Sequence, residues 1–272
     1  MLNVNVAVIM SVYKGDSLEN ISIAVDSILN QNFTNLKLFI YVDGEISTEV
    51  KSYLDSLIYK GCFVHFSPKN NGLAVGLNYL IDEVVSQCDF RYIARMDSDD
   101  ISYENRILKQ VKFLESNLDI DLCGTFCREF GSSFALNVKS LPISHPELER
   151  FSATRCPFIH PTVMFRTSVF QDGVRYPTDT SFTEDMALWF SLLDNGYKFS
   201  NLPEVLLDYR LEESTLTRRL GINKAKSEFF LRNKYMWKLN NFSIYNVFAI
   251  YARFIFHLLP EAGLKLVYKN LR

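Results

Sequence analysis

Short apolar runs alternate with segments of helical period through the first half of the chain. The apolar runs lie at residues 6–10, 36–42, 62–66, 91–96 and 120–126. Between them, apolar residues recur every three or four positions, which is typical of helices that bury one face. A crossover through a helix returns the next strand in the same direction, so this alternation predicts an open, mostly parallel sheet.

The second half of the chain is less regular. From about residue 128 to residue 160 the periodicity is lost, and Pro142, Pro146 and Pro157 interrupt the chain. Regular structure is expected again as a strand at residues 163–165, a helix at 185–195 and short strands near 197–200 and 205–209.

Composition excludes several classes of protein. Of the 272 residues, 48% are hydrophobic and 22% are charged, so the chain can form a core and is not intrinsically disordered. The five cysteines are scattered without a Cys-x-x-Cys pair, which disfavours a disulfide framework or structural zinc and fits a reducing compartment. The first ten residues carry no basic segment, so we expect a cytoplasmic protein rather than a secreted one.

The formal net charge of −2 conceals an uneven distribution. Residues 218–272 contain 11 Lys and Arg but two Asp and Glu, whereas residues 1–217 contain 18 basic and 29 acidic side chains. A basic end on an acidic body favours a polyanionic partner, either nucleic acid or anionic lipid.

The basic end also contains the most hydrophobic segment of the chain, residues 242–259. Its uninterrupted apolar length is below the ~20 residues that a membrane-spanning helix needs. The polar residues of this segment fall on one narrow helical stripe: Ser243, Asn246, Arg253 and His257. The pattern favours an interfacial helix on an anionic membrane surface. A helical pair that packs against the rest of the protein or a second subunit is the alternative.

An acidic cluster, Asp97-Ser98-Asp99-Asp100, follows the expected strand at residues 91–96. Open parallel sheets bind ligands at the carboxyl ends of their strands, so we expect the whole cluster to reach solvent at that edge. Asp97 and Asp99 point the same way in an extended chain, and paired carboxylates without soft ligands nearby suit Mg²⁺ or Mn²⁺. A solvated turn that caps the following helix is an equally open interpretation.

Two further groups of polar residues have both a functional and a structural interpretation. Tyr13 and Asp43 end the first two strands, where they can hold a nucleobase or simply form turns. Thr183 is expected to cap the helix at 185–195, with Glu184 and Asp185 in the first turn, where the helix dipole favours negative charge. The functional alternative is a carboxylate base that faces a cleft.

Eight short blocks, in a fixed order, resemble a known family. They span roughly residues 4 to 219 and read VAVIMSVYKGD, SILNQNF, LFIYVDG, NNGLAVGLN, ARMDSDD, HPTVMFR, TEDMALW and DYRLEES. Together they resemble the inverting family-two glycosyltransferases of the GT-A fold, whose bacterial members build O-antigens, capsules and other surface polysaccharides. The resemblance implies an α/β fold of the GT-A type. It consists of a Rossmann-like, mostly parallel sheet flanked by helices, with a C-terminal helical extension.

The resemblance also implies a division of the chain and a set of site residues. Residues 1–217 are the expected glycosyltransferase domain, and residues 218–272 are the basic amphipathic helical tail. Within the domain, the nucleotide-sugar half is expected at about 1–127 and the acceptor half at about 128–217. The residues expected to hold the donor are Ser11, Val12, Tyr13, Asp43, Asn71, Gly72, Arg95, Asp97 and Ser98. The expected metal ligands are Asp97, Asp99 and, where many family members have a histidine, Glu212. Asp185 is the expected catalytic base, and the acceptor and a diphosphate are expected at Glu184, His160, Arg218 and Arg219.

The implied reaction transfers a hexose, with inversion, from a UDP-sugar to a hydroxyl of a polyprenyl-diphosphate-linked saccharide, which gives a β-glycoside. The implied cofactor is Mn²⁺ or Mg²⁺, and the implied location is the inner face of the cell membrane, in peripheral contact with anionic lipid. A homodimer remains open. Nucleic acid is not an expected partner, because the phenylalanines of the tail lie along a helical stripe and do not form a stacking platform.

Two other functions remain open at this point. One is a phosphotransferase with an aspartate nucleophile, although its aspartates are expected after the first strand, not the fourth. The other is a non-catalytic nucleotide-binding module whose basic tail binds membrane or nucleic acid.

Overall fold

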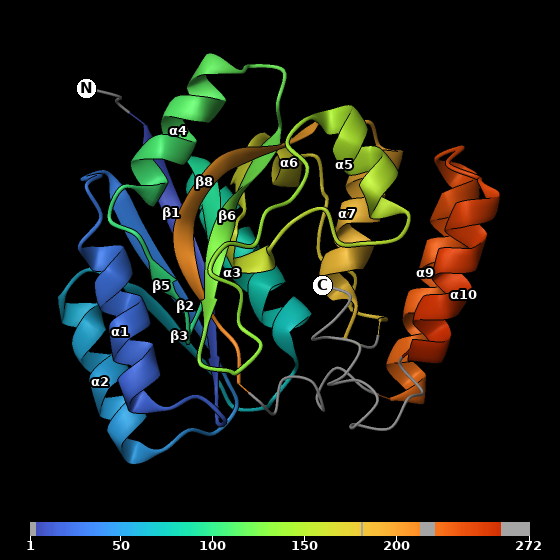
Figure 1. Cartoon of the computed structure of the whole chain (residues 1–272). Helices are drawn as coiled ribbons and strands as arrows, with labels where there is room; N and C mark the ends of the chain where they lie inside the picture. The colour runs from blue at the N-terminus through green and yellow to red at the C-terminus, as the bar shows by residue number, and fades with distance from the viewer. Residues whose placement is uncertain (1–3, 181, 213–220, 257–272) are drawn as a thin grey trace.

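The computed structural model describes residues 4–180, 182–212 and 221–256, which form an eight-stranded sheet with helices on both faces and a C-terminal pair of helices (Figure 1). The strands are β1 (Asn5–Tyr13), β2 (Leu36–Asp43), β3 (Phe63–Ser67), β4 (Phe90–Asp97), β5 (Ile101–Ser102), β6 (Leu122–Phe130), β7 (Met164–Arg166) and β8 (Phe199–Arg210). The helices are α1 (Leu18–Leu29), α2 (Thr48–Tyr59), α3 (Leu73–Gln87), α4 (Arg106–Ser116), α5 (His145–Ser152), α6 (Ser168–Gln171), α7 (Glu184–Asp194), α9 (Ile222–Lys238) and α10 (Ile244–Phe256), with a 3-10 turn at His160–Thr162.

The strand order across the sheet is β3-β2-β1-β4-β7-β6-β8-β5. Neighbouring strands are parallel except where β7 lies between β4 and β6 and where β5 pairs with β8. The expected mostly parallel sheet, flanked by helices, is therefore confirmed.

The alternating side chains of β1 divide the core between the two faces of the sheet. Even-numbered residues such as Val8 pack with α1, α2 and α4, whereas odd-numbered residues such as Ile9 pack with α3, α6 and α7. Both side chains are fully buried. A strand covered on both faces needs an unbroken apolar run, which is what the sequence provides at residues 6–10.

The carboxyl ends of three neighbouring strands meet at one edge of the sheet. Tyr13 of β1 lies opposite Asp43 of β2, and Ser11 of β1 lies opposite Asp97 of β4. The strand register alone thus brings the expected nucleotide-binding residues next to the expected metal-binding residues.

The region after residue 197 differs from the sequence-based expectation. The two short strands expected near 197–200 and 205–209 are one continuous strand, β8. Its pairing with β6 skips Pro203 and Glu204, which lie between the paired residues Leu202 and Val205. The two unpaired residues form a bulge, so the proline does not have to donate to the ladder.

The irregular region expected at residues 128–160 contains one helix, α5. Pro146 stands in its first turn, where the N–H group has no partner within the helix, and Ser144 and Glu147 form a capping box. The proline therefore helps to start this helix and does not interrupt the chain.

The described part of the C-terminal tail is a hairpin of α9 and α10, which confirms the expected helical extension. α9 packs against α7, because the ring of Tyr235 stacks on that of Phe190 at 4.8 Å between centroids and Lys238 forms a 2.6 Å ion pair with Asp194. The expected boundary near Arg218 falls outside the described residues. Within the ranges that are described, no helix combines the length and the hydrophobicity needed to cross a membrane.

Candidate active site

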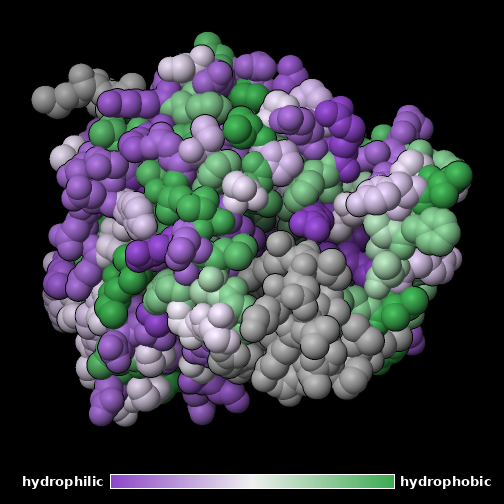
Figure 2. Space-filling view, in the orientation of Figure 1, coloured by the Kyte–Doolittle hydropathy of each residue, from purple (hydrophilic) through white to green (hydrophobic). Residues whose placement is uncertain are grey.

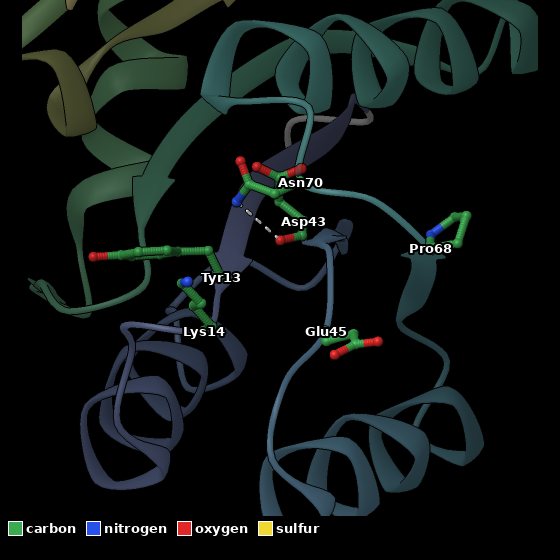
Figure 3. A pocket seen from close by; sticks show the side chains of 6 residues that line it. All are labelled: Tyr13, Lys14, Asp43, Glu45, Pro68 and Asn70. Atoms are coloured by element: carbon green, nitrogen blue, oxygen red, sulfur yellow. Dashed lines mark hydrogen bonds between the residues drawn. The ribbon is translucent and has the colours of Figure 1, made fainter.

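An open cavity of about 550 Å³ lies at the ends of β1 and β2 (Figure 3). Its lining residues are Tyr13, Lys14, Asp43, Glu45, Pro68 and Asn70. The side chain of Asn70 lies against Asp43 and donates a 3.3 Å hydrogen bond to its backbone carbonyl. Tyr13 is 39% exposed, so its ring is available to a flat ligand such as a nucleobase.

The carboxylate of Asp43 organises the loop that precedes α3. Its Oδ1 accepts a 2.7 Å hydrogen bond from the backbone N–H of Asn71, and its Oδ2 accepts a 3.0 Å bond from that of Gly72. Gly72 has φ of +90°, a conformation that favours glycine. Each carboxylate oxygen has two lone pairs, so Asp43 can hold this loop and also accept a bond from a ligand.

The other residues expected to hold the nucleotide have different surroundings. The side chain of Val12 is fully buried in the core, so this residue can offer a ligand only its backbone. The hydroxyl of Ser98 donates a 2.8 Å hydrogen bond to Oδ2 of Asp16 and is directed at the protein itself. Asp16, which the sequence did not single out, therefore joins the loop after β1 to the loop after β4.

Asp97, Asp99 and Asp100 each place a carboxylate oxygen within 4.8 Å of the other two. No other group of three such ligand residues occurs among the residues that the structure describes. The expectation that the whole cluster reaches solvent is wrong for Ser98 and Asp100, which are 7% and 1% exposed. Oδ1 of Asp100 accepts a 2.8 Å hydrogen bond from the backbone N–H of Arg210, while its buried Oδ2 has no hydrogen-bond partner among the described residues.

Glu212 does not belong to this group of carboxylates, contrary to the expectation. β8 contacts the aspartate loop through Arg210, whose Nε donates a 2.8 Å hydrogen bond to the carbonyl of Asp99. The chain then leaves the sheet, and Glu212 is exposed two residues beyond the end of the strand. Asp100 is the third carboxylate of this group, and a role for Glu212 in metal binding stays a prediction.

The three carboxylates are close together, and those of Asp99 and Asp100 are poorly hydrated. Burial, together with the negative charges of Asp97 and Asp16, raises the pKa of Asp99 to about 7, and Arg210 opposes this shift. Burial and the two neighbouring carboxylates raise the pKa of Asp100 well above its usual value. A divalent cation would relieve the repulsion and give the buried oxygen of Asp100 a partner. Hard oxygen donors of this kind suit Mg²⁺ or Mn²⁺, so the residues fit the implied ion.

Two arginines lie beneath the aspartates. Arg95 is 1% exposed, and its guanidinium pairs with Asp97 and donates to the backbone carbonyl of Met96. Arg106 is fully buried and donates a 2.6 Å hydrogen bond to the carbonyl of Arg95, and burial lowers its pKa to about 10. Arg95, which was expected to contact the nucleotide-sugar donor, therefore positions Asp97 from inside the protein.

Asp185 lies in the first turn of α7, as expected. Its Oδ1 accepts a 2.7 Å hydrogen bond from the backbone N–H of Met186, and its Oδ2 accepts a weak 3.9 Å bond from the thiol of Cys156. Burial raises the pKa of Cys156 to about 12, so the thiol keeps its proton. Thr183 is the N-cap residue, but its hydroxyl pairs with that of Ser227 in α9 at 2.7 Å and does not bond the helix.

A histidine–tyrosine pair lies between the aspartate group and α7. Nε2 of His160 is 2.8 Å from the hydroxyl of Tyr176. Loss of hydration, together with the charge of Arg95, lowers the pKa of His160 well below its usual value, so this ring is neutral. The charged groups that act on the buried hydroxyl of Tyr176 are Arg95, Asp185, Asp97 and Glu184. The charges of Asp97 and of both acids of α7 therefore act on the same hydroxyl.

Two groups of expected acceptor residues remain. Glu184 is partly buried beside Asp185, and burial raises its pKa. Arg218 and Arg219 lie outside the residues that the structure describes, so their expected contact with a diphosphate stays a prediction.

This arrangement places a cavity for a nucleobase, a group of carboxylates for a divalent cation and an acid at a helix N-terminus at one edge of a mostly parallel sheet. A donor with a phosphorylated nucleotide fits the first two parts, and a proton acceptor for a hydroxyl fits the third. An α/β fold with such a group of residues suits a transferase that uses a nucleotide-linked donor.

The chain belongs to glycosyl transferase family 2, and residues 7–173 match the sequence pattern of that family. The UDP-Gal:alpha-D-GlcNAc-diphosphoundecaprenol beta-1,3-galactosyltransferase of Escherichia coli is 30% identical over 269 residues, which are 97% of this chain and 95% of that protein. The amylovoran biosynthesis glycosyltransferase AmsE of Erwinia amylovora is 27% identical over 265 residues, which are 97% of this chain and 98% of that protein.

A solved structure shares the fold. Mannosyltransferase PcManGT from Pyrobaculum calidifontis, in complex with GDP-Man and Mn²⁺, matches with a TM-score of 0.65 and 15% identity, over 97% of this chain and 79% of the other. The sequence resemblance to a bacterial surface-polysaccharide glycosyltransferase of family 2 is therefore confirmed.

Proposed function

We propose that the protein transfers a hexose from a UDP-sugar to a hydroxyl of a polyprenyl-diphosphate-linked saccharide during the synthesis of a bacterial surface polysaccharide. The observation that carries the proposal is the group of Asp97, Asp99 and Asp100 beside the cavity at Tyr13 and Asp43. The choice of donor and acceptor is supported by the Escherichia coli relative, which is named for UDP-Gal and for a diphosphoundecaprenol acceptor.

The donor side of the site holds the nucleotide. In the proposal, uracil stacks on the exposed ring of Tyr13 and donates its ring N–H to the carboxylate of Asp43, which also fixes the loop at Asn71 and Gly72. Oxygens of the aspartate group would hold Mn²⁺ or Mg²⁺. When bound, the ion stabilises the negative charge that develops on the departing diphosphate.

The acceptor side of the site removes a proton. Asp185 takes the proton of the acceptor hydroxyl, whose oxygen attacks the anomeric carbon on the face opposite the nucleotide. This single displacement inverts the configuration, so an α-linked UDP-sugar gives a β-glycoside and UDP. The N–H of Met186 and the thiol of Cys156 keep the carboxylate in place at the N-terminus of α7. Glu184 orients the acceptor, and the neutral His160 forms an uncharged wall near it.

Thermal shift and transfer measurements test this proposal together. We expect UDP-sugars to raise the melting temperature more in the presence of Mn²⁺ or Mg²⁺ than in EDTA, because a ligand that binds only the native state stabilises it. We also expect transfer of the sugar to a synthetic saccharide diphosphate that carries a short lipid.

Matched variants assign the roles of the carboxylates. Asp99→Asn is expected to abolish the cation-dependent shift, and Asp185→Asn is expected to keep that shift and lose transfer. Asp119→Asn serves as the control, because this exposed carboxylate precedes β6 at the opposite edge of the sheet. A folded protein without cation-assisted affinity for any UDP-sugar would contradict the proposal.

A further inference from the structure

Helix α10 presents an apolar stripe to solvent. The stripe consists of Ile244, Tyr245, Phe248, Tyr251 and Ile255, whose exposed fractions range from 53% to 74%. The five positions recur at helical spacing and therefore share one side of the helix. None of them carries a charge.

The polar residues of α10 face the protein. Asn246 is 8% exposed and donates a 2.8 Å hydrogen bond to the carbonyl of Asn241. Arg253 pairs with Glu228 of α9, which is buried and also pairs with Arg232 at 2.8 Å. The inner side of α10 also buries Ile250, so both sides of the helix are apolar. The outer side of a surface helix in water is normally polar, so the apolar outer side of α10 suits an apolar environment.

Helix α9 adds aromatic and basic side chains. Phe230 and Trp237 are 67% and 63% exposed. Lys226 and Lys234 are exposed and lie four residues on either side of Phe230, so they share its side of the helix. The combination of large rings and lysines on one side is typical of helices that lie in a lipid interface.

The exposed residues of the two helices form one surface. The ring of Phe229 contacts the rings of Phe230 at 5.9 Å and of Tyr251 at 5.1 Å between centroids, and Trp237 stacks on Phe242 at 4.7 Å. We call this surface, made by the apolar stripe of α10 and the exposed aromatic and lysine residues of α9, the hairpin face. Hydrophobic residues are visible over these helices at the right-hand side of Figure 2, where Figure 1 places α9 and α10.

We propose that the hairpin face binds the surface of an anionic lipid bilayer. The aromatic and aliphatic side chains enter the boundary between headgroups and acyl chains, while the lysines contact anionic headgroups. A second copy of the chain fits this face less well, because a two-fold contact would bring the lysines of both copies together. Glu228, the one acidic residue in the sequence from 221 to 256, is buried and already paired with arginines.

The hairpin face has a fixed position relative to the site. Thr183, at the start of α7, pairs with Ser227 of α9 at 2.7 Å, and Phe190 stacks on Tyr235 with an angle of 4° between the rings. A bilayer bound to the hairpin face therefore lies at a constant position relative to Asp185, which follows Thr183 by two residues. This step rests on the proposed function, since it presents a lipid-linked acceptor to that carboxylate.

Vesicle sedimentation of the full chain tests the proposal. We expect the protein to sediment with vesicles of phosphatidylglycerol and phosphatidylcholine and to bind phosphatidylcholine alone more weakly. Phe248→Glu should lower the partition coefficient about tenfold or more, because it places a charge where an apolar ring enters the interface. Lys226→Glu and Lys234→Glu should each lower it at least about fivefold and remove the preference for anionic lipid.

The matched control is Tyr59→Glu, which makes the same kind of change at a 94% exposed ring at the end of α2. Equal sedimentation of the Phe248→Glu and Tyr59→Glu proteins would overturn the proposal, as would a wild-type protein that binds neither vesicle. Self-association that Phe248→Glu abolishes, without vesicle binding, would assign the face to a second copy and also overturn it.

Donor binding is measured on the same proteins without vesicles. Thermal shifts with UDP-sugar and Mn²⁺ should be equal for the wild type, Phe248→Glu and Tyr59→Glu. Vesicle binding without donor binding would contradict the proposed function and support the hairpin face. Donor binding without vesicle binding would support the proposed function and contradict the proposal for the hairpin face.

Discussion

The hydroxyl of Ser98 donates a 2.8 Å hydrogen bond to Oδ2 of Asp16, the same oxygen that accepts the backbone N–H of Tyr13 at 3.0 Å. The loop after β1, at the nucleotide cavity, is thereby tied to the loop after β4, at the aspartate group. One carboxylate oxygen of Asp16 thus couples the position of Tyr13 to that of the aspartate group.

Loss of this tie should weaken donor binding. We expect Ser98→Ala to lower the affinity for a UDP-sugar in Mn²⁺ by about ten- to 150-fold, since a hydrogen bond to a charged group contributes about 1.5–3 kcal/mol. Calorimetric titration measures the change. Ser56→Ala is the control, because it removes an exposed hydroxyl on α2 that bonds the carbonyl of Tyr53. Equal affinities of the two variants would show that the tie does not position the site.

Removal of one carboxylate should stabilise the metal-free protein. Asp99 is partly buried beside two other carboxylates, and Asp99→Asn keeps its shape while it removes a charge. We expect the variant to gain about 1–2 kcal/mol in EDTA, or several degrees in melting temperature, and to lose its response to Mn²⁺. A lower melting temperature than the wild type in EDTA would contradict the repulsion argument.

His160 should make stability depend on pH. Its pKa is well below the usual value in the folded protein, so below about pH 6.5 the unfolded chain binds a proton that the folded protein does not. The contribution of this group is present above about pH 6.5 and decreases by up to about 1.4 kcal/mol per unit as the pH falls. Urea unfolding at pH 7.5 and 5.5 should show a smaller loss for His160→Gln than for the wild type. Parallel losses in the two proteins would refute the assignment.

Two glycines with the same backbone conformation allow the cost of backbone strain to be distinguished from the cost of a steric clash. Gly44 and Gly61 have φ of +88° and +87°, but a Cβ at Gly44 would lie 2.9 Å from the backbone nitrogen of Asn70, whereas one at Gly61 would meet nothing within 4 Å. We expect Gly61→Ala to lose about 1 kcal/mol of stability through backbone strain alone. Gly44→Ala should lose about 1–2 kcal/mol more and bind UDP-sugar more weakly, because it displaces the wall of the cavity. Equal unfolding midpoints would contradict this difference.

The hydrophobic periodicity of the sequence predicted β1, β2 and β4 well, because each of these strands is buried on both faces and is followed or preceded by an amphipathic helix. The same approach failed where a proline is compatible with regular structure. Pro146 was expected to interrupt the chain but occupies the first turn of α5. The gap expected between two short strands is the bulge of β8 that contains Pro203. Whether a proline interrupts an element depends on hydrogen-bond partners that a single sequence does not reveal.

The site could be predicted where it depends on the end of a strand or the start of a helix. Asp97 is the last residue of β4, so its position follows from the strand itself. The burial of Asp100 depends on Arg210, and the position of Tyr176 depends on Asn78, whose amide donates a 2.8 Å hydrogen bond to its carbonyl. These partners lie about a hundred residues away along the chain, so no local signal indicates them.

The stacking of Tyr235 on Phe190 has a consequence for the extent of the catalytic unit. The part of the chain that matches the family pattern ends at residue 173, before α7 begins, and the outer side of that helix is covered by α9. A protein shortened after residue 212 would expose Met186 and Phe190 to water, although Leu188, Trp189 and Leu192 would still hold α7 against the core. We therefore expect a shortened chain to lose stability first at the helix that carries Asp185.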